Sequence, residues 1–324
     1  MSCDKCLYTI VFLILSFKCL KSGHLLNKDM RKHLHSAAKI NLGLSIVGRR
    51  ADGYHLLESL FWPLSFGDSL EISPGSGKVS LTWDESAPFP IFELPDEANN
   101  IVSKVLRALP NTKLDFDVCI KKQIPIGGGM GGGSSNVGTL LRYLKSENKL
   151  QIPTLNLWSC QFGADIPFFI YDSPAWVSGV GENVLPIKCD SQLIKNLYFL
   201  VVLFPFGCET KRIFSTFKEL NKPFSAQTHP FQNGTINKNS FETYLKSAKN
   251  DLEPMVSELY PDIRRILTKL NDVECLYSGL SGSGSTCFAV FDCLEKLQKT
   301  SKDLQGFFRS NNCKSIFAET YTTH

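Results

Sequence analysis

The sequence predicts an α+β protein with two domains, and three observations support this fold class. Candidate strands and helices follow one another without a regular βα alternation, which argues against a doubly wound parallel sheet. The chain has 324 residues, a length at which two domains are common. Gly179, Gly181 and Pro186 cluster just ahead of a strongly apolar segment, so we expect the border between the domains within residues 175–190.

Most of the expected strands lie in the first half of the chain. Apolar residues alternate at Ile40, Leu42, Leu44 and Ile46, which is the pattern of a strand. Two short candidate strands flank the turn residues 74–77, and we predict that they form a hairpin. The expected strands of this half are residues 36–47, 56–64, 69–72, 79–83 and 116–121, with a helix over residues 100–109.

From residue 134 onward the sequence predicts more helices than strands. Val137, Leu140, Leu141 and Leu144 recur at helical spacing, and the polar residues 225–239 predict a loop. The expected helices are residues 134–145, 155–162, 210–220, 252–260, 263–271 and 294–310. The expected strands are residues 197–205, 276–277, 286–291 and 314–319.

The composition is that of a soluble globular protein, with 43% hydrophobic and 20% charged residues. The net charge is only +4 and no run of Lys and Arg is dense, so we expect no nucleic-acid partner. The 11 cysteines are an odd number without a pairing rhythm, and Cys3 and Cys6 form a lone CxxC. We therefore expect free thiols in a reducing compartment rather than disulfides or a metal site.

The first residues form an apolar segment of their own. Residues 7–17 are an almost continuous apolar run that is too short to span a bilayer comfortably and resembles the hydrophobic region of a signal peptide. Met30, however, stands directly before Arg31 and the first expected strand. We expect residues 1–31 to be an extension outside the fold, with the true start of the protein at Met30. A targeting segment is the alternative.

The densest signal in the chain is a run of six glycines within seven positions, ending at Gly133. Glycine permits positive φ, and such a loop can turn successive backbone N–H groups toward one anion. The helix expected directly after it adds a partial positive charge at the same place. Ser134 and Ser135 can cap that helix or donate their hydroxyls to a phosphate. The run therefore predicts a polyphosphate site.

Two common phosphate motifs do not fit this run, because no Gly-Lys-Ser/Thr closes it and no βαβ unit with an acidic residue follows. A flexible linker is the plain alternative. We disfavour it because a linker would not join an apolar strand directly to an amphipathic helix.

Four stretches carry a resemblance to a known family. Residues 125–135 (PIGGGMGGGSS) resemble the second motif of the GHMP kinases, with Met130 where Leu is usual. Residues 38–44 (AKINLGL) with 50–56 (RADGYHL) resemble the first motif of the diphosphocytidyl-methylerythritol kinases within that superfamily. Residues 163–168 (GADIPF) and 278–288 (SGLSGSGSTCF) resemble two further elements of the same family. The resemblance extends from Lys32 to the C-terminus.

The resemblance implies a two-domain GHMP kinase fold. Residues 32–180 would form the ATP-binding domain, like domain 2 of ribosomal protein S5, and residues 181–324 a ferredoxin-like substrate-binding domain. The implied reaction moves the ATP γ-phosphoryl group to the 2-hydroxyl of 4-diphosphocytidyl-2-C-methyl-D-erythritol, in the non-mevalonate pathway to isoprenoid precursors. ATP is expected with Mg²⁺, which would arrive on the nucleotide because no dedicated acidic cluster is present. The resemblance further implies a cytoplasmic monomer or homodimer without stable membrane association, or an organelle protein if residues 1–29 are a targeting segment.

Lys39 and Asp165 match the catalytic pair of the family. A carboxylate can accept the proton of the attacking hydroxyl, and a neighbouring Lys would hold it ionised and oriented. The residues alone leave plainer readings open, a strand-edge Lys that reaches solvent and a turn or N-cap Asp.

The resemblance also implies the binding residues. Asn41 projects from the same strand face as Lys39 and would contact the substrate. The implied cytosine site and the second glycine loop over the phosphates comprise Tyr54, His55, Phe214, Gly282, Ser283 and Gly284. The implied ATP site comprises Pro125, Gly127, Gly128, Gly129, Gly131, Gly132, Gly133, Ser134 and Ser135.

Two other function classes remain in view. Another GHMP kinase, of the mevalonate or homoserine type, would share the glycine loops but should lack residues 52–55 (DGYH). A catalytically silent nucleotide-binding protein on the same scaffold would not need both Lys39 and Asp165.

Overall fold

The computed structural model describes residues 31–90, 93–110, 114–150, 152, 154–220, 222–228, 230–231 and 233–322. The expectations for residues 1–29, including the CxxC, lie outside this range. Contacts between residues divide the chain into Met1–Arg31 and Lys32–His324, and the second unit is the one described below. Within the described residues, no helix has both the length and the apolar character needed to cross a membrane.

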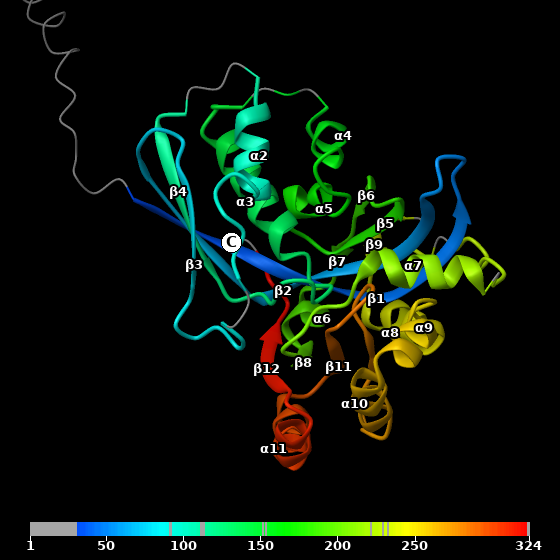
Figure 1. The fold of residues 1–324 in the computed structure, drawn as a ribbon. Coiled ribbons are helices and arrows are strands. Elements are labelled where there is room, and N and C mark those ends of the chain that lie inside the picture. Colours follow the sequence, from blue (N-terminus) through cyan, green and yellow to red (C-terminus); the bar gives the residue numbers. More distant parts are fainter. Residues whose placement is uncertain are drawn as a thin grey trace, which may run out of the picture. The chain divides into compact units, whose positions relative to one another are not determined.

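The first sheet is built on two long antiparallel strands, β1 (Lys32–Arg49) and β2 (His55–Pro74) (Figure 1). Its other strands are β3 (Val79–Trp83), β4 (Phe116–Lys122), β5 (Ala175–Gly179) and β6 (Asn183–Pro186). The order is β3-β4-β2-β5-β6, and β1 pairs with β2. Gly43, with φ +80°, lies where the β1–β2 register shifts between Leu42 and Ser45.

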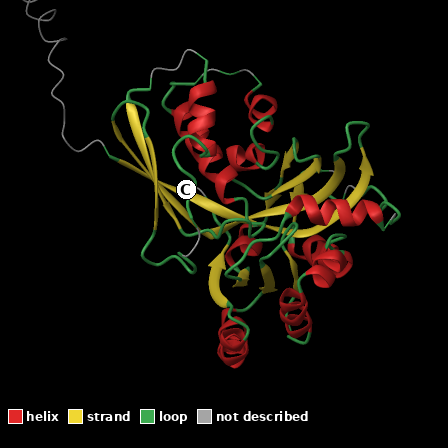
Figure 2. Cartoon of the chain, viewed as in Figure 1, coloured by secondary structure: helices red, strands yellow, loops and turns green. Residues whose placement is uncertain are grey.

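Four helices follow in the same half of the chain, α2 (Ile101–Ala108), α3 (Gly132–Ser146), α4 (Leu155–Cys160) and α5 (Ile166–Tyr171). They gather on one side of the first sheet (Figure 2). Asn100 begins α2, because its side chain accepts a hydrogen bond from the Val102 N–H at 2.6 Å. The expected inner face of α3 is confirmed, since all four of its predicted apolar residues are at most 1% exposed.

The second sheet has the order β10-β11-β8-β12, with antiparallel neighbours throughout. Its strands are β8 (Tyr198–Leu203), β10 (Tyr277–Leu280), β11 (Cys287–Phe291) and β12 (Lys314–Glu319). Its helices are α7 (Thr210–Glu219), α9 (Glu253–Leu259), α10 (Pro261–Asn271) and α11 (Leu294–Ser310). β8 is apolar throughout because alternate residues enter two different cores, Phe199 and Val201 in one, Leu200 and Val202 in the other.

The hairpin predicted for residues 69–83 is wrong. β4 lies between the two segments: it pairs antiparallel with β2 and parallel with β3. The connecting turn wraps the start of β4, where the Asp117 carboxylate accepts hydrogen bonds from the Ser76 and Lys78 N–H groups. Those two bonds lower the pKa of Asp117. The turn chemistry was recognised correctly, but the partner strand came from a distant part of the chain.

The loop predicted for residues 225–239 also contains regular structure. β9 (Thr235–Ile236) pairs in parallel with β7 (Lys188–Cys189), and α8 (Lys238–Ser247) begins at its end. Asn237 and Ser240 form a reciprocal capping box at this helix start, a signal that the sequence contained. The short helix α6 (Ser191–Lys195) completes the segment between the sheets. Contacts group residues 32–324 as one unit, so the domain border at residues 180 and 181 stays a prediction.

Candidate active site

The first glycine loop, residues 125–133, leads from β4 into α3. Gly127, Gly129 and Gly131 have φ values of +72°, +77° and +73°, so every second residue adopts the left-handed conformation. Such alternation turns consecutive N–H groups into one concavity that suits an anion. Gly131 is the N-cap of α3 and offers no side chain to its N–H groups. The start of α3 therefore presents backbone donors and its partial positive charge to the loop.

A second glycine loop, residues 281–286, packs against the back of the first. A Cβ on Gly129 would lie 2.3 Å from the Ser281 carbonyl oxygen and 2.9 Å from that of Gly284. The Ser281 hydroxyl donates to the Gly129 carbonyl at 2.9 Å, and the Thr286 N–H donates to the Gly128 carbonyl at 3.1 Å. Glycine at position 129 is thus required by packing between loops as well as by backbone conformation.

Lys39 and Asp165 meet beside the start of α3. The Lys39 Nζ lies 3.4 Å from the Asp165 Oδ2, so the expected ion pair is present. The same ammonium donates to the Asn41 Oδ1 at 2.7 Å and lies 4.5 Å from the centre of the Phe61 ring. A Cβ on Gly131 would be 3.4 Å from the Lys39 Cε, which places this side chain next to the helix start. The strand-edge reading of Lys39 is excluded, because Lys39 is only 4% exposed.

Asp165 stands at the N-cap position of α5, yet its side chain forms no capping hydrogen bond. Its carboxylate is instead directed to Lys39 and is 31% exposed. An Asp that leaves its own helix start uncapped and reaches solvent beside a buried cation is available to an incoming ligand.

Asn41 is 1% exposed and its amide is engaged within the protein. Its Nδ2 donates to the Ser59 Oγ at 2.9 Å, and its Oδ1 holds Lys39. The backbone N–H donates to the Ser281 Oγ at 3.3 Å. In this geometry Asn41 fixes Lys39 and links β1 to the second glycine loop. The substrate contact that the sequence suggested stays a prediction.

A cavity of about 350 Å³ opens along the first glycine loop and is lined by residues 125–134. Part of its lining is apolar, formed by Leu81, Leu94, Pro95 and Ile101, which sequence reasoning missed. Their signal was absent because they come from three separate segments. The cavity therefore has both the backbone donors of the loop and apolar side chains in its lining, which suits a nucleotide.

Ser134 lines this cavity, whereas Ser135 does not. The Ser135 side chain is fully buried; its hydroxyl donates to the Ala37 carbonyl at 2.6 Å and shares a hydrogen bond of 2.7 Å with the Ser36 hydroxyl. Its N–H donates to the Gly131 carbonyl at 2.8 Å. In this structure the Ser135 hydroxyl fastens α3 to β1, and its predicted contact with the nucleotide stays a prediction.

The expected cytosine residues lie on the β1–β2 turn and on α7. Gly53, with φ +95°, shapes the turn, and the Tyr54 ring is 66% exposed. His55 stacks on Phe214 with 5.2 Å between ring centres and 26° between planes. Burial, with a smaller contribution from Arg49, lowers the pKa of His55 below its ordinary value of 6.5. The imidazole is therefore neutral at pH 7 and can both donate and accept a hydrogen bond.

The start of α7 is joined to the second glycine loop. The Thr210 and Ser283 hydroxyls share a hydrogen bond of 2.8 Å, and Phe214 follows one helical turn after Thr210. Gly282 and Gly284 have φ values of +58° and +85°. A Cβ on Gly282 would lie 3.2 Å from the Asn41 Oδ1, so this loop passes directly over the Lys39 site. The second glycine loop thus links the Lys39 site to the start of α7, and the binding roles of the predicted site residues stay predictions.

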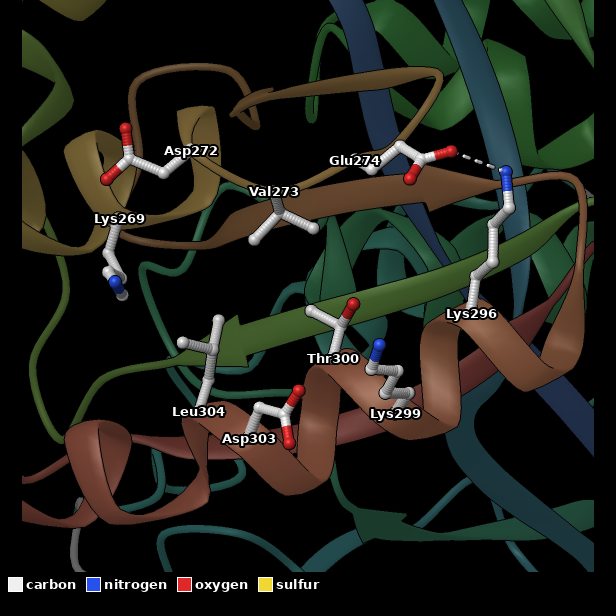
Figure 3. Close-up of a pocket in the computed structure, with 9 residues that line it drawn as sticks. All are labelled: Lys269, Asp272, Val273, Glu274, Lys296, Lys299, Thr300, Asp303 and Leu304. Carbon is white, nitrogen blue, oxygen red and sulfur yellow. Dashed lines mark hydrogen bonds and ion pairs between the residues drawn. The ribbon is translucent and has the colours of Figure 1, made fainter.

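Two negative findings bound the site. Within the residues that the structure describes, no three or more His, Cys, Asp and Glu side chains are grouped so as to hold a metal ion. A separate pocket of about 320 Å³ lies between α10 and α11 and is lined by charged side chains such as Lys269 and Asp303 (Figure 3). There Lys296 donates to Glu274 at 2.9 Å. None of the predicted site residues lines this pocket.

The comparisons with known proteins agree with this geometry. Residues 100–173 match the model of the GHMP kinases N terminal domain, and residues 235–309 match that of the GHMP kinases C terminal. The fold resembles the crystal structure of a 4-(cytidine 5'-diphospho)-2C-methyl-D-erythritol kinase, with TM-score 0.65 and 23% identity over 90% of this chain and 100% of that one. It also resembles homoserine kinase from Cytophaga hutchinsonii, with TM-score 0.62 and 16% identity over 90% and 94%. Fold and site together define a small-molecule kinase of the GHMP class.

Curated relatives identify the family within this class. A 4-diphosphocytidyl-2-C-methyl-D-erythritol kinase of Pelodictyon phaeoclathratiforme is 30% identical over 85% of this chain and 94% of its own length, and one of Thermodesulfovibrio yellowstonii is 35% identical over 84% and 93%. The chain belongs to the 4-diphosphocytidyl-2-C-methyl-D-erythritol kinase family, and the resemblance found in the sequence is confirmed.

Proposed function

We propose that this chain transfers the γ-phosphoryl group of ATP to the 2-hydroxyl of 4-diphosphocytidyl-2-C-methyl-D-erythritol, a step on the non-mevalonate route to isoprenoid precursors. The observation that carries the proposal is the Lys39–Asp165 pair, 3.4 Å apart beside the first glycine loop. Family membership supports the identity of the alcohol, because the relatives bear its name.

The first glycine loop and the start of α3 bind the phosphates of ATP through backbone N–H groups. The base lies against the apolar side chains of Leu81, Pro95 and Ile101. A Mg²⁺ ion bound with the nucleotide would neutralise charge on the phosphate oxygens. Ser134, in the first turn of α3, is the oxygen donor that would face it.

Asp165 accepts the proton of the 2-hydroxyl as that oxygen attacks the γ-phosphorus. Lys39 holds the carboxylate in place through the ion pair, and its charge stabilises the negative charge that develops on the transferring group. Asn41 and the Phe61 ring fix the ammonium from the other side. The catalytic pair is thus preorganised before substrate arrives.

The cytosine is held between Tyr54 and Phe214, with neutral His55 hydrogen-bonded to its polar edge. The exposed ring of Tyr54 on its glycine-shaped turn supports this role. The second glycine loop, with Gly282, Ser283 and Gly284, covers the substrate diphosphate. Its hydrogen bond to Thr210 supports a coupling between base and phosphate binding through α7.

Release of ADP from ATP by the purified chain, measured with a panel of alcohols, tests the proposal. We expect turnover with the diphosphocytidyl alcohol and none with mevalonate or homoserine. Turnover with either of the latter would assign another GHMP activity. ATP binding without turnover on any alcohol would identify a silent nucleotide-binding protein.

The same proposal places the protein in the cytoplasm, or in a plastid or other organelle if residues 1–29 direct it there. Free thiols at all eight cysteines that the structure describes, with Cys208, Cys287 and Cys313 buried, support a reducing compartment. A fluorescent fusion to the C-terminus of the full chain distinguishes the locations, and secretion would contradict all of them.

A further inference from the structure

A buried carboxylate lies behind the first glycine loop. Asp68, in β2, is 0% exposed. Its Oδ1 accepts hydrogen bonds from the N–H groups of Gln123, at 2.8 Å, and Ile124, at 2.9 Å. Its Oδ2 accepts from the Asn136 Nδ2 at 2.9 Å and forms an ion pair with Lys122. One carboxylate therefore receives four donors.

These donors come from the two ends of the loop. Gln123 and Ile124 directly precede Pro125, where the loop leaves β4. Asn136 lies just beyond it in α3, and its Nδ2 also donates to the Ser36 Oγ in β1 at 2.9 Å. Asp68 thus connects the entry and the exit of the loop through a single side chain and fixes both to the first sheet.

The loop needs such a connection because of its composition. Its glycines have more conformations open to them than other residues, so an unrestrained loop would lose more entropy on binding an anion. The nest geometry requires positive φ at three of these positions. If both ends are fixed, the N–H groups are held in the binding arrangement before the nucleotide arrives, which raises affinity without any new contact.

We infer that Asp68 is a positioning residue that holds the first glycine loop at the width its phosphate ligand requires. The inference rests on the proposed binding of ATP at this loop. Asp68 itself has no exposed surface and therefore acts through the loop, not on the nucleotide. A charged group this deeply buried is costly, and the four donors around Asp68 offset that cost only while both loop ends keep their positions.

The test is Asp68→Asn. The amide oxygen of Asn can still accept from the N–H groups of Gln123 and Ile124, at the entry of the loop. Its NH₂ group faces the donors Lys122 and Asn136 and cannot accept from them, so the bond that ties the exit of the loop to position 68 is lost. We expect the Kd of a non-hydrolysable ATP analogue and the KM for ATP to rise about ten-fold or more, the effect of losing a hydrogen bond to a charged group. We expect the kcat at saturating ATP and the Kd of the diphosphocytidyl alcohol to change less than about three-fold.

Glu58→Gln is the matched control. Glu58 lies in the same strand, is 3% exposed and accepts a hydrogen bond from the Thr228 N–H at 2.7 Å. Because its partner lies outside the glycine loops, we expect this variant to lose stability but to bind the ATP analogue as the unaltered protein does.

The affinities of Asp68→Asn for the ATP analogue and for the alcohol decide the inference. Unchanged affinity of folded Asp68→Asn for the analogue overturns it, and so does an equal loss of affinity for the analogue and the alcohol, which would mark a general structural role. If Asp68→Asn does not fold, Asn136→Ala, which removes the exit-side bond to Asp68 together with the bonds to Ser36 and Lys122, must show the selective loss. Unaltered protein that binds the analogue but does not phosphorylate the diphosphocytidyl alcohol would contradict the proposed function and leave this inference standing.

Discussion

Lys39 is a buried cation whose partners come from different parts of the chain. Asn41 belongs to the same strand, Phe61 to the neighbouring strand and Asp165 to the start of α5. Burying an ammonium this deeply costs free energy because the group loses its hydration. The Asp165 carboxylate and the Asn41 amide offset that cost. The position of Lys39 therefore depends on Asp165.

Replacing Asp165 by Asn should remove the base while keeping the shape of the side chain. We expect kcat to fall by about 10²- to 10⁴-fold, the range for loss of a general base, with the Kd for ATP changed by less than about three-fold. Steady-state kinetics and equilibrium nucleotide binding measure the two effects separately.

Asp172→Asn is the control at the opposite end of the same helix. Asp172 is buried and forms an ion pair with Arg142 at 3.0 Å, outside the proposed site. This variant should lose stability and keep its kcat. If Asp165→Asn kept its full turnover number, Asp165 would not be the base.

The two glycine loops illustrate how elements, not single residues, build the site. The first loop leads from β4 into α3 and the second joins β10 to β11. The two loops touch through Ser281, Thr286 and the backbone of Gly128 and Gly129. At Gly129 the constraint comes from carbonyl oxygens, which cannot move aside as the end of a flexible side chain could.

Gly129→Ala should therefore destabilise the protein by about 1–3 kcal/mol, the cost of a left-handed conformation for a residue with a Cβ. The close approach of that Cβ to the Ser281 carbonyl oxygen should add to this cost. Chemical denaturation gives the free energy of unfolding. Gly306→Ala is the control within α11, because a Cβ there meets nothing within 4 Å. It should stabilise the protein by about 0.4–1 kcal/mol. Equal stability of the two variants would contradict the proposed packing of the loops.

At the level of elements the sequence was a good guide to helices and a weaker one to strand pairing. The amphipathic face of α3 was visible in the spacing of Val137, Leu140, Leu141 and Leu144. The parallel pairing of β3 with β4 was not visible, because it joins residues some forty positions apart. The spacing of apolar residues predicts which side of a helix or strand is buried, but not which neighbouring element covers that side.

At the scale of the whole molecule, stability should depend on pH through histidines that fold in the neutral form. Burial lowers the pKa of His35 below 6.5, and it packs against the Tyr321 ring at 4.9 Å. The unfolded chain therefore binds more protons than the folded one between the lowered pKa and 6.5. By linkage the free energy of unfolding falls as the pH drops through that window and levels off below it.

Urea unfolding at pH 7.5 and at several lower pH values measures this decline. We expect His35→Gln to show a smaller decline than the unaltered protein, because it cannot take up the proton. His33→Gln, at an exposed position in the same strand, serves as the control and should follow the unaltered protein. An identical decline in all three proteins would show that His35 is not responsible.

The amino-acid sequence alone was sufficient for the fold class, most helices and the first glycine loop, and its short motifs carried the family resemblance that implied the pairing of Lys39 with Asp165. These features are written locally, in periodicity, in a run of glycines and in short motifs, and so they could be recognised without neighbours. Even Lys122 could have been noticed, since Phe116, Val118 and Ile120 place it on the buried face of β4.

Other features arose only when distant segments met. The four donors around Asp68, the withdrawal of Ser135 into the fold and the contact of Asn41 with Ser281, 240 positions away, have no trace in local pattern. Hydrogen bonds of this kind need a donor and an acceptor atom about 3 Å apart. That distance is set by the packing of the two sheets and their helices, which no single stretch of the chain encodes.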